Sequence, residues 1–405
     1  MVFQPSKLGR IAVAEQSDWI SAGGSAASTT ATTAVCEAEI SYPSQTQAAL
    51  STDAIAGVFR SPRISAGALA GTFSLTMPIH AWSSATPSAA PAAGNLFPDA
   101  MFLKHVLGGV SYSGFSPDTD SITGGTTSVL TMDGADTAVM LPGQAILVPL
   151  ASGHSVGWIQ SVDETASPDN VTLTAQLSAV PASTGQVYGS ISTFMNTTTN
   201  APLTVTWQAN NANSQIRMED CVVTSATIAA TPKEQPKLTV ELQAKSWTNV
   251  GSGGAPGQYA FPLPQLPALI GNNNARLTVS NTATNVSTFE IAITNDVAEV
   301  LSHASTEGVA QFVTTNRAVT CSFTAPAETL ATMAPGTARI LQLDLANVPG
   351  QSFSCIIPGA ILQESSSIGD SEGLISESFV YASGGYTSDE NSDNAGNSLA
   401  RVAWL

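Results

Sequence analysis

The segment Gly153–Gly157 comes closest to a catalytic motif in this sequence, because it reads Gly-His-Ser-Val-Gly. The pattern G-x-S-x-G is typical of lipases and esterases, in which the serine attacks an ester from a sharp turn between a strand and a helix. Here residues 158–165 have the pattern of a second strand, and only His303 follows as a candidate base. The sequence therefore predicts that Ser155 lies next to a hairpin turn and that the chain is not an enzyme.

Two further patterns could bind ligands, but neither has the required spacing. Residues 251–254 are rich in glycine and lack the lysine and the strand–helix context of a phosphate-binding loop. The acidic run Asp389, Glu390 and Asp393 lacks the regular spacing and the glycine of a calcium loop, so a solvated acidic loop is the better interpretation. We expect no catalytic, cofactor-binding or metal-binding residues, and no cofactor.

The cysteines and the N-terminus indicate a compartment. The cysteines stand apart in apolar segments with no C-x-x-C pair, so a zinc site is not expected. The N-terminal residues lack the apolar core of a signal peptide, and no segment approaches the ~20 apolar residues of a membrane-spanning helix. We expect a chain made in a reducing cytoplasm, with no membrane partner and with four buried, reduced thiols. These are Cys36, Cys221, Cys321 and Cys355.

Charged residues make up 11% of the 405 residues, whereas about a quarter is usual for globular domains. Apolar residues reach 43%, which excludes a disordered chain. So few surface charges are typical of a protein covered by neighbouring copies of itself. An extracellular protein with a neutral, Ser/Thr-rich surface is the alternative. With 13 basic and 30 acidic residues, the chain is not a nucleic-acid binder that grips phosphates.

The acidic residues are unevenly distributed. No lysine or arginine lies between Lys104 and Arg217, and none lies between Arg339 and Arg401. The first stretch holds seven acids and the second holds eight, together 15 of the 17 net negative charges. These acids are Asp118, Asp120, Asp133, Asp136, Asp163, Glu164, Asp169, Asp344, Glu364, Asp370, Glu372, Glu377, Asp389, Glu390 and Asp393.

Alternation of apolar and polar residues with a period of two dominates the chain and predicts a mostly β fold. Residues 236–247 are the clearest case, with Leu238, Val240 and Leu242 on one face and polar residues on the other. Further strands are expected near 34–42, 68–77, 145–150, 156–162, 171–177, 203–209, 219–230, 276–294, 309–325, 339–345, 353–364 and 374–382.

Helical signals are scarce. Residues 98–107 are the best candidate, because Pro98 suits the first turn of a helix and Gly108 suits its end. One or two helical turns are also expected within Asp296–His303.

The two halves of the chain resemble each other in the order of short sequence matches. Each match alone could arise by chance in a β-rich sequence, but four matches keep the same order, which predicts two domain-sized copies. The first copy holds a long insertion between Phe73 and Leu203. The matches are Leu69–Phe73 with Val319–Phe323, Glu37–Ile40 with Glu290–Ile293, Cys221–Ile228 with Cys355–Leu362, and the segment from Leu238 with that from Leu374.

The order of signals in the first copy resembles that of the tail tube (major tail) proteins of long-tailed bacteriophages. A polar arm and a strand are followed by a hairpin around Arg60–Arg63 and Leu69–Leu75, by a short helix ending in Leu-Gly at 107–108, and by closing strands at 203–209 and 218–245. The second copy, 286–405, follows the same order, with Ala327–Met333 in the place of the helix.

The resemblance implies two tandem tail-tube-like β-sandwich or half-barrel modules with at most one short helix each, plus an inserted small β-subdomain that decorates the first module. The expected boundaries are an N-terminal arm at 1–33, a first tube module at 34–247 with an insertion at 111–200, a linker at 248–274 and a second tube module at 275–405.

The resemblance also implies a structural virion protein. Such modules join sheet edges into rings that stack into a tube for DNA ejection, so two modules imply three chains per ring with pseudo-sixfold symmetry. DNA would pass through the lumen without specific binding, past acids drawn partly from the two stretches that lack Lys and Arg. Expected partners are other copies, the tape measure protein, the tail terminator and distal tail proteins. The expected location is the virion tail, after assembly in the bacterial cytoplasm. The alternative is an extracellular or capsid-associated β-sandwich adhesin or decoration protein.

Overall fold

The computed structural model gives the chain one helix and twenty-three strands within the residues that it describes, which confirms the mostly β fold class. His303, Ala327–Met333 and the acidic run at 389–393 lie outside the described residues. Those residues are 8–20, 35–52, 63–80, 97–108, 110–112, 122–132, 137, 140–166, 168–183, 185–189, 191–194, 201–209, 214–231, 234–251, 276–284, 286–302, 308–326, 336–346, 348–371, 374–383 and 398–405.

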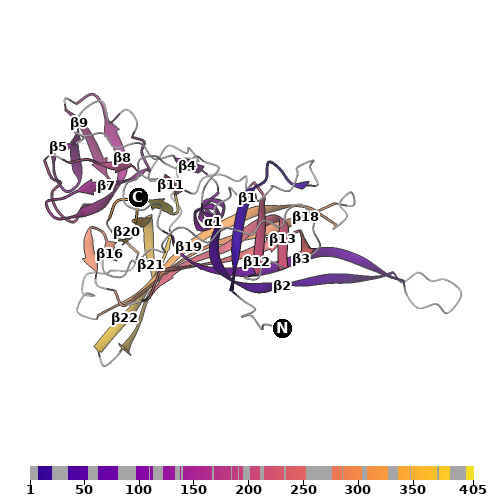
Figure 1. Ribbon diagram of the computed structural model, residues 1–405. Coiled ribbons are helices and arrows are strands. Elements are labelled where there is room, and N and C mark those ends of the chain that lie inside the picture. Colours follow the sequence, from indigo (N-terminus) through magenta and orange to yellow (C-terminus); the bar gives the residue numbers. More distant parts are fainter. Residues whose placement is uncertain are drawn as a thin grey trace.

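Six strands of the first half close into a barrel (Figure 1). They pair antiparallel in the cyclic order β1-β2-β3-β14-β13-β12 and back to β1. Alternate residues point inward, so Leu238, Val240 and Leu242 of β14 are buried as the sequence predicts. The strands are β1 (Leu8–Glu15), β2 (Val35–Thr52), β3 (Arg63–Pro78), β12 (Leu203–Ala209), β13 (Ser214–Ala230) and β14 (Lys237–Ala244).

The second half repeats this strand order without closing. Its strands pair in the order β16-β20-β21-β22-β19-β18, and each pair has its counterpart in the order β1-β12-β13-β14-β3-β2. The ring stays open because β16 pairs with the short β17 (Thr282–Thr284), not with β18. The half-barrel consists of β16 (Arg276–Val279), β18 (Thr288–Leu301), β19 (Val309–Pro326), β20 (Ala338–Leu345), β21 (Phe353–Ser371) and β22 (Leu374–Ser383).

Cross-strand partners identify equivalent residues in the two halves. Cys221 on β13 lies opposite Leu203 on β12, and Cys355 on β21 lies opposite Leu343 on β20. The match between the two cysteines is therefore also a match in strand register.

The register then passes along the sheet in the same way in both halves. Ile228 pairs with Leu238 and Leu238 with Met77. Leu362 likewise pairs with Tyr381 and Tyr381 with Cys321, so Met77 is the counterpart of Cys321.

The match between Glu37–Ile40 and Glu290–Ile293 is also a match in register. Ile40 pairs with Leu75 and Ile293 pairs with Val319, and Leu75 is the counterpart of Val319 just as Met77 is of Cys321. The match between Leu69–Phe73 and Val319–Phe323 is wrong in register by six residues. An alternating strand looks like itself after a shift by an even number of residues, so a short match does not fix the register.

The expected helix at 98–107 is confirmed as α1 (Pro98–Leu107), which ends at Gly108 with a φ of 100°. It packs on β1, β13 and β18, and most of its side chains are buried, including the acidic Asp99 near its start. The turns expected within Asp296–His303 are wrong for the described residues of that segment. There β18 remains extended, because its pairing with β19 continues to Leu301.

Part of the expected N-terminal arm is a barrel strand. Leu8–Glu15 forms β1 between β2 and β12, where it buries Ile11 and Val13 in the core. The start of the expected linker is also a strand, β15 (Ser246–Gly251), which continues along β13. The rest of that linker lies outside the described residues.

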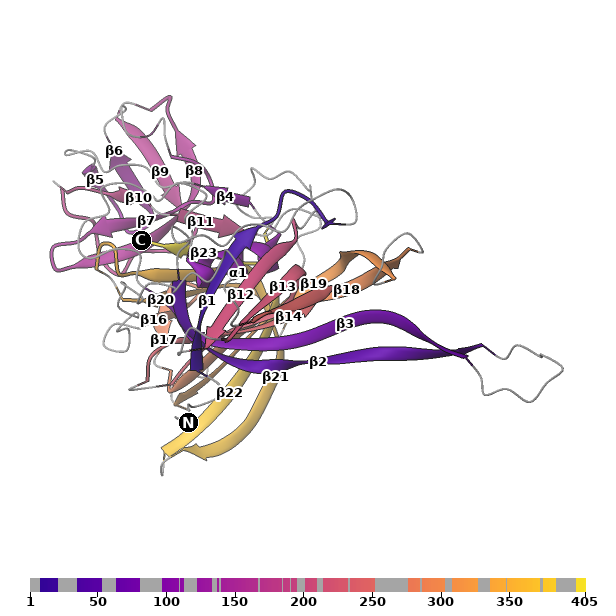
Figure 2. The same cartoon turned by 45° about the vertical axis from the view of Figure 1, so that its right-hand side comes forward.

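The insertion holds a separate six-stranded sheet in the order β10-β7-β8-β9-β6-β5, with its own apolar core (Figure 2). The expected β-subdomain is thus present between residues 122 and 189. Its strands are β5 (Ile122–Gly125), β6 (Val129–Met132), β7 (Ala145–Pro149), β8 (His154–Asp163), β9 (Asp169–Leu173) and β10 (Tyr188–Gly189).

This subdomain is attached to the second module, and the expectation that it decorates the first is wrong. The strands that flank it, β4 (Val110–Tyr112) and β11 (Ile191–Phe194), pair with each other, and β11 also pairs with β23 (Arg401–Trp404). Because β23 pairs with β21, the flanking strands extend the sheet of the second module. An apolar cluster that includes Trp158 and Ile356 joins the subdomain to the same sheet.

We predict that all four cysteines react as free thiols only after unfolding. All are buried, and burial raises the pKa of Cys321 to about 12 and also raises the pKa of Cys221 and Cys355. Titration with Ellman's reagent in the absence of reductant should count four thiols in denaturant and almost none in the native protein. A count below four after unfolding would contradict the prediction.

Candidate functional site

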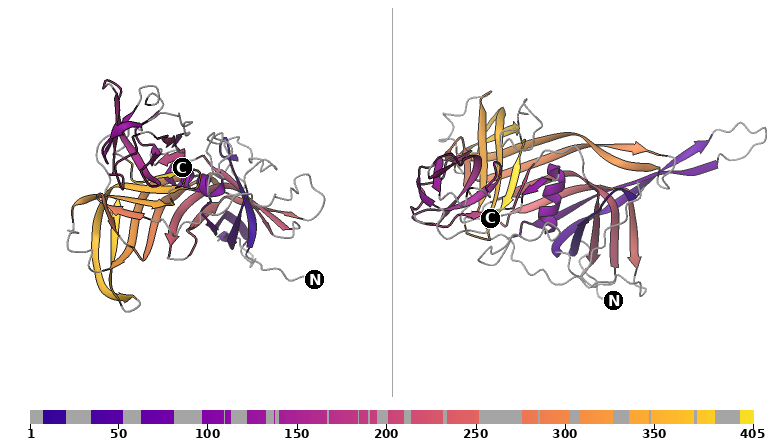
Figure 3. Two further views of the ribbon diagram at one scale, coloured as in Figure 1. Left: turned by 60° about the vertical axis from the view of Figure 1, so that its left-hand side comes forward. Right: turned by 90° about the horizontal axis from the view of Figure 1, so that it is seen from above.

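A single curved sheet runs through both modules (Figure 3). Its strand order is β2-β3-β14-β13-β18-β19-β22-β21, and the pairing of β13 with β18 joins the two halves. Residues that lie directly opposite each other share a face of an antiparallel sheet. At the junction Ile228 and Ile291 face the core, whereas Thr227 and Ala292 face the other side.

We call that other side the hydroxyl-rich face, because short Ser, Thr and Ala side chains cover it. Neighbouring hydroxyls bond to each other, Thr76 to Thr239 at 3.2 Å and Thr324 to Ser378 at 3.3 Å. Its uncharged members include Ser41, Thr72, Ser74, Thr76, Ser225, Thr227, Ala229, Thr239, Gln243, Thr288, Ala292, Thr294, Ala318, Thr320, Ser322, Thr324, Ile361, Ser378, Val380 and Ala382.

Charged side chains on the hydroxyl-rich face are mostly acidic. Glu39, Glu241 and Glu290 are exposed on it in register with neighbouring hydroxyls, and Lys237 stands at the start of β14. Asp296 is exposed on the same face opposite Asn316. None of these four acids belongs to the two stretches without Lys and Arg. The alternation of apolar and polar residues could have identified these acids from the sequence, because each one occupies a polar position of an alternating strand.

Four acids of the two stretches lie away from this face. Asp163 and Glu164 are exposed at the end of β8 in the inserted subdomain, and Asp169 is buried beside Thr137. Asp344 is buried on β20. The first stretch includes the whole inserted subdomain, so its lack of basic residues does not mark a surface of the large sheet.

The sheet has an unpaired strand edge at each end. β1 covers the outer edge of β2 only as far as Glu39, and β20 covers the outer edge of β21 only as far as Ile361. Within the described part of the chain, no strand pairs with the outer edge of β2 over 44–52 or with that of β21 over 362–371. Unpaired edges are sites for strand addition by another chain.

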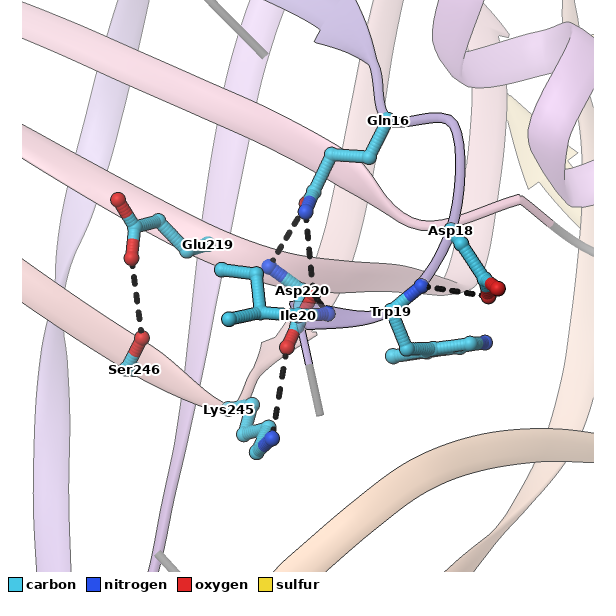
Figure 4. A network of polar contacts seen from close by, with 8 residues as sticks. All are labelled: Gln16, Asp18, Trp19, Ile20, Glu219, Asp220, Lys245 and Ser246. Carbon is cyan, nitrogen blue, oxygen red and sulfur yellow. Dashed lines mark hydrogen bonds and ion pairs between the residues drawn. The ribbon is translucent and has the colours of Figure 1, made fainter. Parts of the chain in front are cut away.

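A buried carboxylate holds the first module together at the junction (Figure 4). Asp220 has a φ of 51°, rare for a residue other than glycine, and it accepts hydrogen bonds from the side chain of Gln16 and from the amide of Ile20, both at 3.1 Å. Lys245 lies 3.5 Å from its other oxygen. Burial raises the pKa of Asp220. These bonds hold the loop after β1, whose Trp19 packs edge-on against Phe312 of β19.

The equivalent position in the second module anchors the inserted subdomain. Ser354 precedes Cys355 as Asp220 precedes Cys221, and its hydroxyl accepts a hydrogen bond from the indole of Trp158 at 3.0 Å. The same hydroxyl donates to Asp344 at 2.7 Å. An indole only donates, so the single proton of Ser354 must go to Asp344.

Asp344 also accepts from the amide of Gln342, at 3.0 Å to each oxygen, and that amide reaches the carbonyl of Val156 on the subdomain. Burial is the largest influence on this carboxyl and raises its pKa to about 6, although the hydrogen bonds from Gln342 and Ser354 oppose the rise. The bridge between subdomain and second module therefore contains an ionisable group that titrates near neutral pH.

Ser155 lies in the hairpin between β7 and β8, as predicted. Gly153 has a φ of 79° in the turn, and its carbonyl accepts a hydrogen bond from Leu150. Ser155 itself is in β8, where its buried hydroxyl accepts a hydrogen bond from the amide of Ser178 at 3.3 Å. The strand-to-helix turn that a nucleophilic serine requires is not found here.

Searches for two other kinds of site gave no candidate in the described residues. No group of three or more His, Cys, Asp or Glu side chains there is placed to hold a metal ion. Likewise, none of the helical segments in the described ranges has the length and apolar character needed to cross a membrane.

We predict that Asp344 makes the protein more resistant to urea as the pH falls from 7 to 5. The folded pKa of about 6 exceeds the ordinary value of 3.8, so the folded state takes up the proton first and gains stability in this window. Relative to Asp344→Asn, the wild type should gain about 1 kcal/mol in the free energy of unfolding.

The comparison with Asp344→Asn isolates this carboxyl, because all other titrating groups are common to both proteins. Glu164→Gln, which removes an exposed acid, is the control and should follow the wild type. Parallel stability curves for the wild type and Asp344→Asn would contradict the assignment.

We further predict that Ser155→Ala leaves the oligomeric state unchanged and lowers stability by about 1 kcal/mol, through the lost hydrogen bond from Ser178. The wild type should not hydrolyse p-nitrophenyl esters above background. Stoichiometric labelling of Ser155 by a fluorophosphonate would overturn the prediction.

No protein-family model matches the chain, and no curated protein matches it.

Proposed function

We propose that this chain is a structural subunit that assembles edge to edge into rings, and that the rings stack into the tail tube of a long-tailed bacteriophage. The observation that carries the proposal is the repeated strand order with one sheet continuous across the junction of β13 and β18. Two similar modules already share one sheet within the chain, and repeating this contact between chains would build a ring of such modules.

The module count sets the proposed stoichiometry. If six modules close a ring, three chains are needed, and the ring has pseudo-sixfold symmetry. Because one inserted subdomain accompanies each pair of modules and is seated on the second, alternate modules differ where it is attached.

The hydroxyl-rich face suits the wall of a channel for DNA. Most of its side chains are short, and its described charges are Glu39, Glu241, Glu290 and Asp296 against Lys237. DNA carries one negative charge per ~1.7 Å, so a basic wall would hold it and slow its passage. Under this proposal the chain is not an enzyme. It works in the virion tail after assembly in the host cytoplasm, with the tape measure protein, the tail terminator and distal tail proteins as further partners.

A second candidate function is that of a capsid-associated or extracellular decoration protein or adhesin. The inserted subdomain favours it, because this unit has its own core and exposes Val180 and Leu141 at 58% and 44%. Large exposed apolar side chains are common at binding surfaces. This function needs no ring.

Electron microscopy and sedimentation of the purified protein test the proposal. We expect rings or tubes whose end-on averages are sixfold near the inner wall and threefold further out, where the subdomains differ between modules. Sedimentation of single rings should give three chains. Rings of six chains would contradict the stoichiometry, and a protein that remains monomeric at high concentration would favour the second candidate.

A further inference from the structure

We propose that the first half of β1, residues 8–12, is a removable cover on β2. In the single chain it occupies the place on β2 that strand β13 of the first module occupies on β18, and it leaves β2 when another copy joins there. This inference rests on the proposed ring, and it names the contact inside the chain that must open before the ring can form.

The register of the two modules shows that the two places are equivalent. Ile293 is the counterpart of Ile40, so the part of β18 that pairs with β13, residues 289–294, is the counterpart of 36–41 on β2. The first half of β1 pairs with β2 from Val35 to Glu39, which overlaps this part over 36–39. Both pairings use the same edge, because β3 and β19 lie along the other edge of β2 and of β18.

The second module shows a module without the cover. Its counterpart of β1 is β16, which pairs with β20 as β1 pairs with β12. Among the described residues β16 has no pair with β18, and β13 lies along β18 instead. With β13 in this place Ile291 and Ile293 are buried, as are their counterparts Ala38 and Ile40 beside β1. A neighbouring module can therefore replace the first strand without exposing the core.

The cover can leave β2 without unfolding the rest of β1, because β1 is paired on both of its edges. Its other edge pairs with β12 from Gly9 to Glu15. The indole of Trp207 on β12 lies directly over Gly9, where there is no room for a β carbon. β1 and β12 can thus swing away from β2 together, and the backbone amides and carbonyls of β2 exchange one strand partner for another.

The strand at the other end of the large sheet, β21, has a cover of the same kind. β20 begins at Ala338, well before Leu343, which is the counterpart of the first residue of β12. Its extra residues pair with β21 at 360–361, the counterpart of 226–227, where β13 pairs with β18. Both surfaces that would repeat the internal junction are therefore covered in the single chain. A covered edge does not recruit other strands, so joining begins with the release of a cover.

Disulfide locks on β1 test the inference, because opposite residues of antiparallel strands have Cα atoms about 4.5–5.5 Å apart, within reach of a disulfide. Arg10 lies opposite Glu37 on β2 and opposite Gln208 on β12. Arg10→Cys/Glu37→Cys therefore locks the cover on β2, and Arg10→Cys/Gln208→Cys, which locks β1 to β12, is the matched control. After oxidation and unfolding, each variant should show only the four native thiols.

The oxidised Arg10→Cys/Glu37→Cys variant should remain a single folded chain in sedimentation and lose nearly all rings in electron micrographs. Dithiothreitol should restore the rings, which distinguishes a lock from misfolding. The oxidised Arg10→Cys/Gln208→Cys variant should form rings as the wild type does. Leu8→Cys/Glu39→Cys is a second lock on β2 and should behave like the first.

The outcomes separate this inference from the proposed ring. Rings from both oxidised β2 locks would overturn the inference and leave the ring standing. Loss of rings in the oxidised β12 lock as well would also overturn it, because β1 would then have to leave both neighbours. A wild type that forms no rings would overturn the inference together with the proposed function.

Discussion

Strand β13 pairs with four strands through its two edges, and the arrangement of the rest of the large sheet depends on these pairings. Its first part pairs with β12 and β15, and its second part pairs with β14 and β18. β12 and β18 pair with successive parts of the same edge of β13. This is possible only if β13 leaves the barrel at the point where its partner changes from β12 to β18. Asp220 stands near that point in a left-handed conformation, and hydrogen bonds from Gln16 and Ile20 offset the cost of its conformation and burial.

The two modules use the same position for comparable tasks with different chemistry. Asp220 and Ser354 both precede the equivalent cysteines, and each fixes a segment that carries a tryptophan. In the first module the segment is the loop with Trp19, and in the second it is strand β8 with Trp158. A buried polar group at this position fixes the attached segment more tightly than apolar packing alone, because an unpaired partner would cost free energy.

Local patterns predicted the parts of the fold that local physics determines. The alternation at 236–247 and the helix signals at Pro98 and Gly108 depend on neighbouring residues only, and both predictions are confirmed. The β1 strand was missed because its partners β2 and β12 are distant in sequence, and the extension of β18 to Leu301 depends on β19. The attachment of the insertion to the second module could not be predicted. It depends on strand pairs of three or four residues, which are too short to leave a pattern in the sequence. The acids of the hydroxyl-rich face follow from alternation, but which face they share follows only from the register across β13 and β18.

The place of the inserted subdomain has a consequence for the order of folding. Trp158 and Ser354 are 196 residues apart, and β11 must wait for β23 before it can join the sheet. A ribosome adds ~5–20 residues per second, so the subdomain is complete many seconds before the strands of the second module on which it docks are synthesised. During translation it is therefore a tethered unit that depends on its own core. Docking becomes possible only when β23 has been synthesised, which makes the docked subdomain a sign that translation has passed Trp404.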